Sequence, residues 1–118
     1  MLGDWPHIQQ NIIKLADLFT DQAGNKYMVT CMPEGTTLEE YVSNLDEAFI
    51  PIKSVITLTK AIASVILELH SRMIVHRDIS LANVHIKTGK PHRANQPKTI
   101  ESLKLGGFDL AFCFEKDN

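Results

Sequence analysis

HRDISLAN, residues 76–83, is the most informative stretch of this chain. It places Asp78 and Asn83 five residues apart, so a single loop can present a carboxylate and an amide oxygen to one ligand. A positioned carboxylate accepts or orients the proton of a hydroxyl group, and an amide oxygen can hold a metal ion that is bound to phosphates. The stretch therefore predicts a phosphoryl-transfer loop, with Asp78 as the catalytic, base-like residue and Asn83 as a metal ligand.

A long helix is predicted directly before this loop, from about Ser54 to Ser71. The face expected to be buried carries five apolar residues: Val55, Ile62, Val65, Ile66 and Leu69. Apolar residues also lie on its other sides, so most of the helix surface needs a cover. Lys60 and Glu68 interrupt the segment, which falls short of the roughly 20 apolar residues that span a bilayer. We expect a core helix and no membrane span.

A β-hairpin is predicted near the start of the chain. Residues 8–19 fit both a helix and a strand by periodicity alone. Residues 21–25 are rich in turn formers, and residues 26–31 are β-branched and aromatic, which favours a strand after a turn. This makes residues 12–19 the expected partner strand.

Shorter elements complete the predicted domain. Thr37 stands three residues before Glu40, a capping-box pattern that predicts a short helix ending near Leu45. Short strands are expected at residues 73–75, 84–86 and 103–105. The stretch 87–102 is basic and contains two prolines, so we expect it to be a solvated loop within a second hairpin. The fold class predicted from these elements is α+β.

Composition limits the class of protein. The chain has 118 residues, 44% of them hydrophobic and 22% charged, which suits one small domain with a packed core and excludes a disordered chain. The net charge of -2 argues against a nucleic-acid partner. Cys31 and Cys113 form no CxxC pair, and the first residues lack the pattern of a secretory signal. We therefore expect an intracellular, cytoplasmic setting.

Several further stretches resemble the eukaryotic protein kinase family in order and spacing. They are NIIKL (11–15), YMV (27–29), MPEGTTL (32–38), ILELHS (66–71) and LKLGGFDLA (103–111). The resemblance implies a partial protein-kinase fold over residues 1–118. Residues 1–32 would hold small-lobe strands and the hinge, and residues 33–118 the first part of the large lobe. It also implies ATP-dependent, Mg²⁺-assisted phosphoryl transfer to a protein Ser or Thr hydroxyl.

The resemblance assigns nucleotide contacts to the hinge. Met32 is expected to supply the backbone N–H that recognises adenine, because Pro33 has no N–H to donate. In this register Val29 lies at the back of the pocket, and Cys31 belongs to the same cofactor-binding segment. The alternative register, with Thr30 at the back, loses that hydrogen bond.

Other family positions fall in and after the HRDISLAN loop. Ser80 stands where Ser/Thr kinases usually have a lysine that contacts the γ-phosphate, and His85 stands where an apolar side chain lies beneath the adenine. By resemblance, His76 and Phe108 are packing residues. Arg77 would pair with a phosphorylated activation loop in an intact kinase.

The metal-binding segment departs from the family. Gly107 replaces the family's metal-binding aspartate, and Asp109 stands where the family has glycine. On an extended chain residues two apart share a face, so Asp109 is a second metal-ligand candidate. An aspartate after Phe108, together with HRDIS, also resembles fungal-type protein kinases.

Other family motifs do not occur in these 118 residues. There is no GxGxxG, no V-A-I-K lysine and no APE segment. We expect little or no catalysis by this chain alone. The alternative interpretation is a non-catalytic pseudokinase or a kinase-interacting inhibitory module. A second kinase or another protein partner is expected to cover the apolar sides of the long helix.

Overall fold

The computed structural model describes residues 9–45, 49–90 and 97–114. Two helices, several short strands and three 3₁₀ turns make up this part of the chain. In chain order they are η2 (Gln9–Asn11), β1 (Leu15–Thr20), β2 (Lys26–Thr30), β3 (Thr36–Thr37), α1 (Leu38–Ser43), α2 (Ile52–Ser71), β4 (Ile74–Val75), η3 (Leu81–Asn83), β5 (Val84–Thr88), β6 (Ile100–Leu105), η4 (Phe108–Leu110) and β7 (Phe112–Cys113). The arrangement is the mixed helix-and-strand fold predicted from the sequence.

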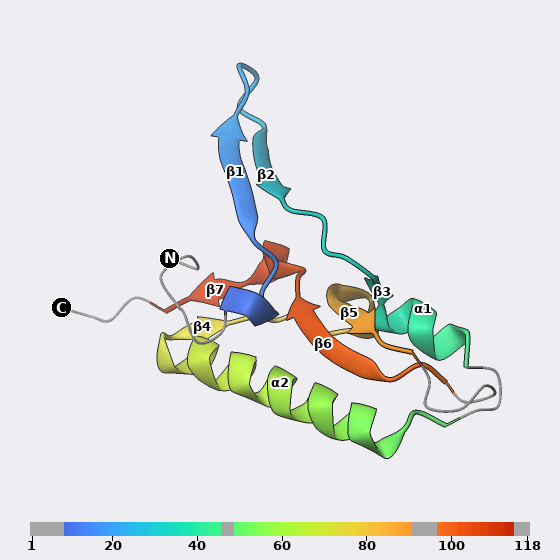
Figure 1. Ribbon diagram of the computed structural model, residues 1–118. Helices are drawn as coiled ribbons and strands as arrows, with labels where there is room; N and C mark the ends of the chain where they lie inside the picture. Colours follow the sequence, from blue (N-terminus) through green and yellow to red (C-terminus); the bar gives the residue numbers. More distant parts are fainter. Residues whose placement is uncertain (1–8, 46–48, 91–96, 115–118) are drawn as a thin grey trace.

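The core lies between α2 and a small antiparallel sheet of order β3-β5-β6 (Figure 1). In the register of β5 and β6, Val84 lies opposite Leu105 and Ile86 opposite Leu103. These four side chains are buried, and they pack with three buried residues of α2, namely Leu58, Val65 and Leu69. The second predicted hairpin is therefore confirmed. The HRDISLAN loop leads directly into its first strand, β5, at Val84.

The prediction of a solvated loop over residues 87–102 is wrong at both ends. Strand β5 continues to Thr88, and β6 already begins at Ile100, whose side chain is only 4% exposed. The buried Ser54 hydroxyl of α2 accepts a hydrogen bond from the Ile100 amide at 2.8 Å. Contacts with a distant helix therefore order a segment whose local composition is that of a loop.

Helix α1 begins as its capping pattern predicts. The Thr37 hydroxyl accepts a hydrogen bond from the Glu40 amide at 3.2 Å. The Glu40 carboxylate accepts a hydrogen bond from the Thr36 hydroxyl, in place of the Thr37 amide that donates to it in a complete capping box. The helix ends at Ser43, two residues earlier than expected. Tyr41 of this helix is buried, and its hydroxyl donates to the Lys98 carbonyl at 2.6 Å. Burial raises the pKa of the Tyr41 hydroxyl.

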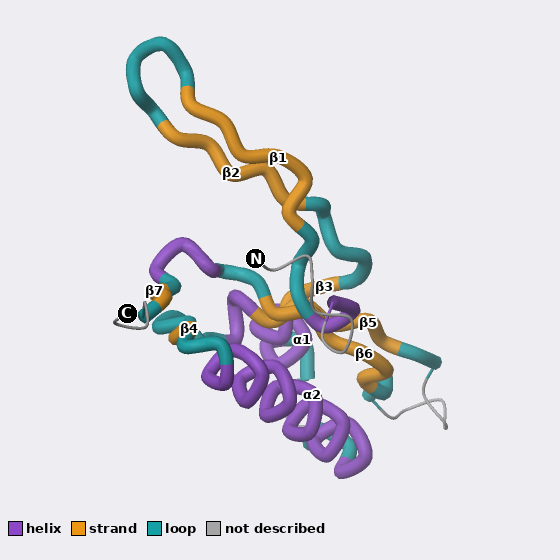
Figure 2. Tube along the Cα trace, turned by 90° about the vertical axis from the view of Figure 1, so that its left-hand side faces the viewer, coloured by secondary structure: helices purple, strands orange, loops and turns teal. Residues whose placement is uncertain are grey.

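The β1–β2 hairpin stands away from the rest of the fold (Figures 1 and 2). All residues of both strands are exposed, and the stacked rings of Phe19 and Tyr27 lie 5.0 Å apart. Hydrogen bonds from Asn25 and Tyr27 to the Asp21 carboxylate brace the turn and lower the pKa of Asp21. The strand interpretation of this region is confirmed from Leu15 onward.

Helix α2 buries most of the face predicted for it: Val65 and Leu69 are buried and Ile62 and Ile66 are half-buried. Leu58 is buried, whereas Val55 is exposed, so the expectation for Val55 is wrong. In the first turn of α2 the buried residue is Ser54, whose hydroxyl accepts the hydrogen bond from the Ile100 amide of β6. Large side chains remain exposed on the outer face: Ile52, Val55, Ile56 and Leu67. In the part of the chain that the structure describes, no helix has both the length and the apolar character to cross a membrane.

Two glycines offer a matched test of the fold. Both have positive φ, +94° at Gly35 and +87° at Gly24, but only at Gly35 would a Cβ meet the Ile86 carbonyl oxygen, at 2.1 Å. We expect Gly24→Ala to cost about 1–2 kcal/mol through left-handed strain. Gly35→Ala should cost about 1–3 kcal/mol more, since β3 must move off β5. Denaturant unfolding measures both, and equal losses would contradict the close approach of Gly35 to β5.

Candidate functional site

His76, the first residue of the HRDISLAN loop, anchors the loop to the protein interior. This side chain is buried, its Nδ1 accepts a hydrogen bond from the Asp78 amide at 3.0 Å, and its Nε2 lies 2.7 Å from the Gly106 carbonyl oxygen. An acceptor at Nδ1 requires the proton to be on Nε2, so Nε2 donates to Gly106. The ring also meets Phe108 edge-on, with centroids 4.7 Å apart. The predicted packing role of His76 and Phe108 is confirmed.

Asp78 and Asn83 are brought together as the sequence predicts. The Asn83 side-chain nitrogen donates to the Asp78 backbone carbonyl at 2.8 Å and to its carboxylate at 3.0 Å. The amide of Gly106 in turn donates to the Asn83 carbonyl at 2.8 Å. The two bonds to Asp78 use the nitrogen of the Asn83 side chain, and Gly106 bonds to the Asn83 backbone, so the side-chain oxygen stays available as an acceptor.

Gly107 faces this pair. Its backbone is left-handed, with φ 69° and ψ 40°. A Cβ at this position would lie 2.3 Å from Asn83 Cγ, so a side chain at position 107 would project directly onto the Asn83 amide. Glycine supplies no such group. The loop therefore has the Asn83 amide that is predicted to be a metal ligand, and the chain supplies no carboxylate from position 107.

Asp109 does not lie on an extended chain, so the prediction that it shares a face with position 107 is wrong. Asp109 lies within η4, after the left-handed Gly107, so the chain turns between the two positions. The two-residue periodicity of a strand does not apply in a 3₁₀ turn. Its exposed side chain makes no hydrogen bond or ion pair within the described residues.

Within the described residues, the loop offers too few ligands to hold Mg²⁺ without phosphate oxygens from a bound nucleotide. Mg²⁺ requires near-octahedral oxygen coordination, usually with carboxylates and phosphate oxygens among its ligands. Within residues 9–45, 49–90 and 97–114, no group of three or more His, Cys, Asp or Glu side chains could hold a metal. The loop offers one carboxylate, at Asp78, and one amide oxygen, at Asn83.

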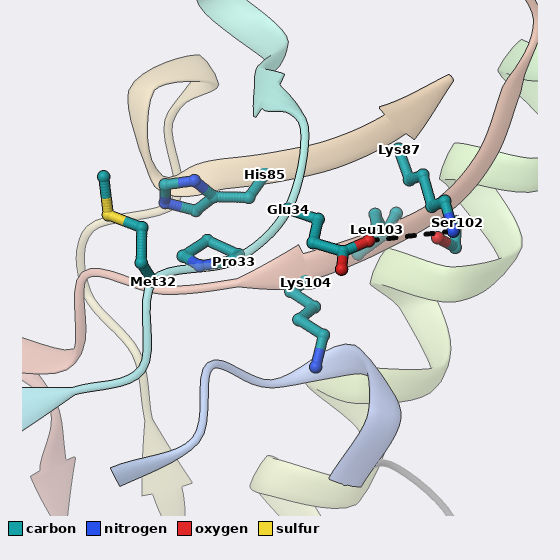
Figure 3. Close-up of a pocket in the computed structure, with 8 residues that line it drawn as sticks. All are labelled: Met32, Pro33, Glu34, His85, Lys87, Ser102, Leu103 and Lys104. Atoms are coloured by element: carbon teal, nitrogen blue, oxygen red, sulfur yellow. Dashed lines mark ion pairs between the residues drawn. The ribbon is translucent and has the colours of Figure 1, made fainter. Parts of the chain in front are cut away.

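A cavity of about 360 Å³ lies between the segment after β2 and the outer face of β5–β6 (Figure 3). Met32, Pro33 and His85 gather at one end, and Glu34 reaches the Lys87 ammonium group at 3.8 Å at the other. Met32 and His85, both proposed nucleotide contacts, therefore share one hollow. Its other lining residues are Ser102, Leu103 and Lys104.

The remaining predicted contacts lie outside this cavity. Val29 and Cys31 are exposed at the base of the hairpin, and Ser80 is exposed beside η3. Lys87 and Lys104 are cavity residues that are not predicted from the sequence. Lys104 could have been predicted from cross-strand pairing, because it lies directly opposite His85 in the register of β5 and β6.

Known proteins resemble this chain over most of its length. A family model described as "Protein kinase domain" matches residues 6–118. The probable serine/threonine-protein kinase zyg-1 of Caenorhabditis briggsae is 29% identical over 105 residues, and the match covers 86% of this chain and 13% of the relative. A chain in the crystal structure of the yeast RNA Pol II CTD kinase CTDK-1 complex has a TM-score of 0.65 at 22% identity, covering 97% of this chain and 33% of that chain. The chain thus spans a small part of these relatives, and the structural match shows the likeness of fold.

Proposed function

The chain belongs to the protein kinase family, and from this premise we propose that its HRDISLAN loop serves ATP-dependent phosphoryl transfer to a protein Ser or Thr hydroxyl. The observation that carries the proposal is the bonded pair of Asp78 and Asn83. The Asn83 side-chain nitrogen holds the Asp78 carboxylate at 3.0 Å while His76 fixes the Asp78 amide. A hydroxyl bound over this loop would meet a carboxylate whose backbone and side chain are both restrained.

The proposed cofactors are ATP and Mg²⁺. The Met32 amide makes no hydrogen bond within the described residues, which leaves it available to an adenine ring. His85 lines the same cavity, and the proposal assigns it to the floor beneath the base. The proposed back of the pocket is Val29, with Cys31 between it and Met32, and Ser80 is proposed to lie on the phosphate side.

We also propose that the 118-residue chain does not complete the reaction by itself. Support comes from Gly107, which leaves position 107 without the carboxylate that would face Asn83. The same feature favours a second candidate function, a non-catalytic pseudokinase or inhibitory module that uses the fold as a binding surface. Restoring the carboxylate separates the two.

Gly107→Asp is expected to create a metal site when the chain is joined to a complete small lobe. Aspartate tolerates a left-handed backbone better than most residues. A Cβ at position 107 would lie 2.3 Å from Asn83 Cγ, so the Asn83 side chain must shift before the two groups can face one ion. We expect Mg²⁺-dependent ATP affinity to rise by about tenfold, in line with loss or gain of one charged ligand contact. Calorimetric titration of ATP with and without Mg²⁺ measures the change.

Asp109→Ala serves as the matched control for this substitution. It removes the other candidate carboxylate from an exposed position and should leave the Mg²⁺ dependence unaltered. If Asp109→Ala abolishes Mg²⁺-dependent binding while Gly107→Asp adds nothing, Asp109 is the working ligand and our assignment of position 107 is wrong. Phosphate transfer by the Gly107→Asp protein that survives Asp78→Asn would refute the role of Asp78.

A further inference from the structure

Arg77 has an unusual backbone conformation. Its φ is 70°, in the left-handed region, although it is not glycine. Residues other than glycine persist there only when surrounding contacts over-determine the conformation. Arg77 immediately precedes Asp78, the proposed base. The contacts that hold Arg77 in this conformation therefore also set the backbone direction at Asp78.

Two contacts hold the Arg77 side chain. Its Nε donates to the Leu110 carbonyl oxygen at 2.5 Å, and its guanidinium carbon lies 5.6 Å from the centroid of the Phe112 ring. A planar, weakly hydrated guanidinium suits both a carbonyl acceptor and an aromatic face. Together they tie the HRDISLAN loop to the segment that follows η4.

Phe112 is itself held in place. It lies in β7, where it pairs with Val75 of β4, next to the loop (Figure 1). Its ring meets Phe114 edge-on at 4.8 Å, and the Phe114 amide donates to the Met73 carbonyl at 2.8 Å. The aromatic surface under Arg77 is therefore fixed to the same strand that leads into the loop.

The charge of Arg77 is not paired with a carboxylate in the described part of the chain. The ion pairs there join Arg72 to Glu68 and Lys87 to Glu34. Asp109 lies next to Leu110 yet makes no ion pair with Arg77. A carbonyl dipole and an aromatic ring are therefore the groups that hold this cation.

We propose that Arg77 is a positioning residue, and that its clamp on Leu110 and Phe112 orients Asp78 without a phosphate group. The inference rests on the proposed function, because it concerns the orientation of the proposed base. It differs from the expectation drawn from the family resemblance, in which Arg77 pairs with a phosphorylated loop. Here the guanidinium is already engaged by the chain's own β7 segment.

Phe112→Leu tests the clamp, and Phe19→Leu on the separate β1–β2 hairpin is its matched control. The two rings are similarly exposed, at 46% and 47%, but Phe112 carries the contact with Arg77. Hydrogen exchange is measured at the Asp78 and Asn83 amides, which bond to His76 Nδ1 and the Ser80 carbonyl. We expect exchange there to rise about fivefold in Phe112→Leu and in Arg77→Gln, with no further rise in the double variant and no change in Phe112→Tyr.

The Arg77 Nε proton resonance provides an independent signature. It should lie upfield in the unaltered chain because of the Phe112 ring current, and move downfield in Phe112→Leu but not in Phe19→Leu. The clamp is refuted if Phe19→Leu has the same effect as Phe112→Leu, if the Arg77 and Phe112 effects add, or if exchange in β5 and β6 rises equally. The last result would show general destabilisation.

The proposed function is tested separately from the clamp. In the Gly107→Asp protein joined to a small lobe, Asp78→Asn should abolish transfer, and Phe112→Leu should lower kcat about tenfold with little change in KM. Transfer that depends on Asp78 but not on Phe112 overturns the clamp alone. Absence of transfer in every variant overturns the proposed function, and the exchange and resonance measurements still decide whether the clamp exists.

Discussion

The 118-residue chain, incubated with ATP, Mg²⁺ or Mn²⁺ and a general protein substrate, is expected to transfer no more phosphate than its Asp78→Asn variant. The loop holds Asp78 and Asn83 together, but position 107 offers no carboxylate to a metal. The 118 residues also contain no GxGxxG and no V-A-I-K lysine. Each of these parts normally contributes orders of magnitude to phosphoryl transfer.

Incorporation of radiolabel into substrate measures this activity. The Asp78→Asn variant is a close control because an amide keeps the size of the side chain while removing its charge. Incorporation that disappears in Asp78→Asn would contradict the prediction, and would show that the loop works without the carboxylate at position 107. Incorporation that persists in the variant would instead come from a contaminating activity.

The features that the sequence predicted well are those encoded locally. Asp78 and Asn83 lie five residues apart, so the geometry of one loop suffices to bring them together. The capping of α1 by Thr37 and the β1–β2 turn near Asp21 also depend on neighbours within a few residues. Such features require no knowledge of the tertiary fold.

The features that the sequence could not predict depend on distant partners. Strand β7 forms because Phe112 and Cys113 pair with β4, nearly forty residues earlier. Ile100 joins β6 because Ser54 of α2 receives its amide hydrogen bond. Nothing in the composition of residues 87–102 reveals the bond between Ile100 and Ser54, since strand pairing depends on tertiary context more than on local composition.

Rotation of a helix that is apolar on several sides is equally hard to predict. Val55 and Leu58 are both apolar, so periodicity gives no reason to bury one and expose the other. In the first turns of α2 it is Ser54 and Leu58 that are buried, with Ser54 bonded to β6, and Val55 is exposed, whereas the rest of the predicted face is buried or half-buried. In the candidate site, the 3₁₀ turn at Phe108–Leu110 likewise replaced the extended chain assumed for Asp109.

The outer face of α2 is expected to make the isolated chain self-associate. We call the exposed residues Ile52, Val55, Ile56 and Leu67 the α2 stripe, and its end members, Ile52 and Leu67, are 76% and 72% exposed. Three of the four, Ile52, Val55 and Ile56, lie within the first turns of α2, and clustered exposed apolar side chains mark sites of protein association. The same stripe is the surface we propose for a protein partner, such as another kinase. Sedimentation velocity over a concentration series, with a dye that reports exposed apolar surface, measures the association.

An Ile52→Lys/Leu67→Lys double variant should weaken this association sharply. Each large aliphatic side chain contributes about 1.5–3 kcal/mol when buried, so losing one should weaken association by roughly 10- to 100-fold. The new lysines would also add to the charge of Lys53 and Lys60, which flank the stripe. Leu18→Lys is the matched control, because Leu18 is 66% exposed on the separate β1–β2 hairpin. If Leu18→Lys disperses the assembly and the double variant does not, the hairpin is the associating surface. A monodisperse parent chain with a cooperative melt and no dye binding would show that the α2 stripe needs no cover.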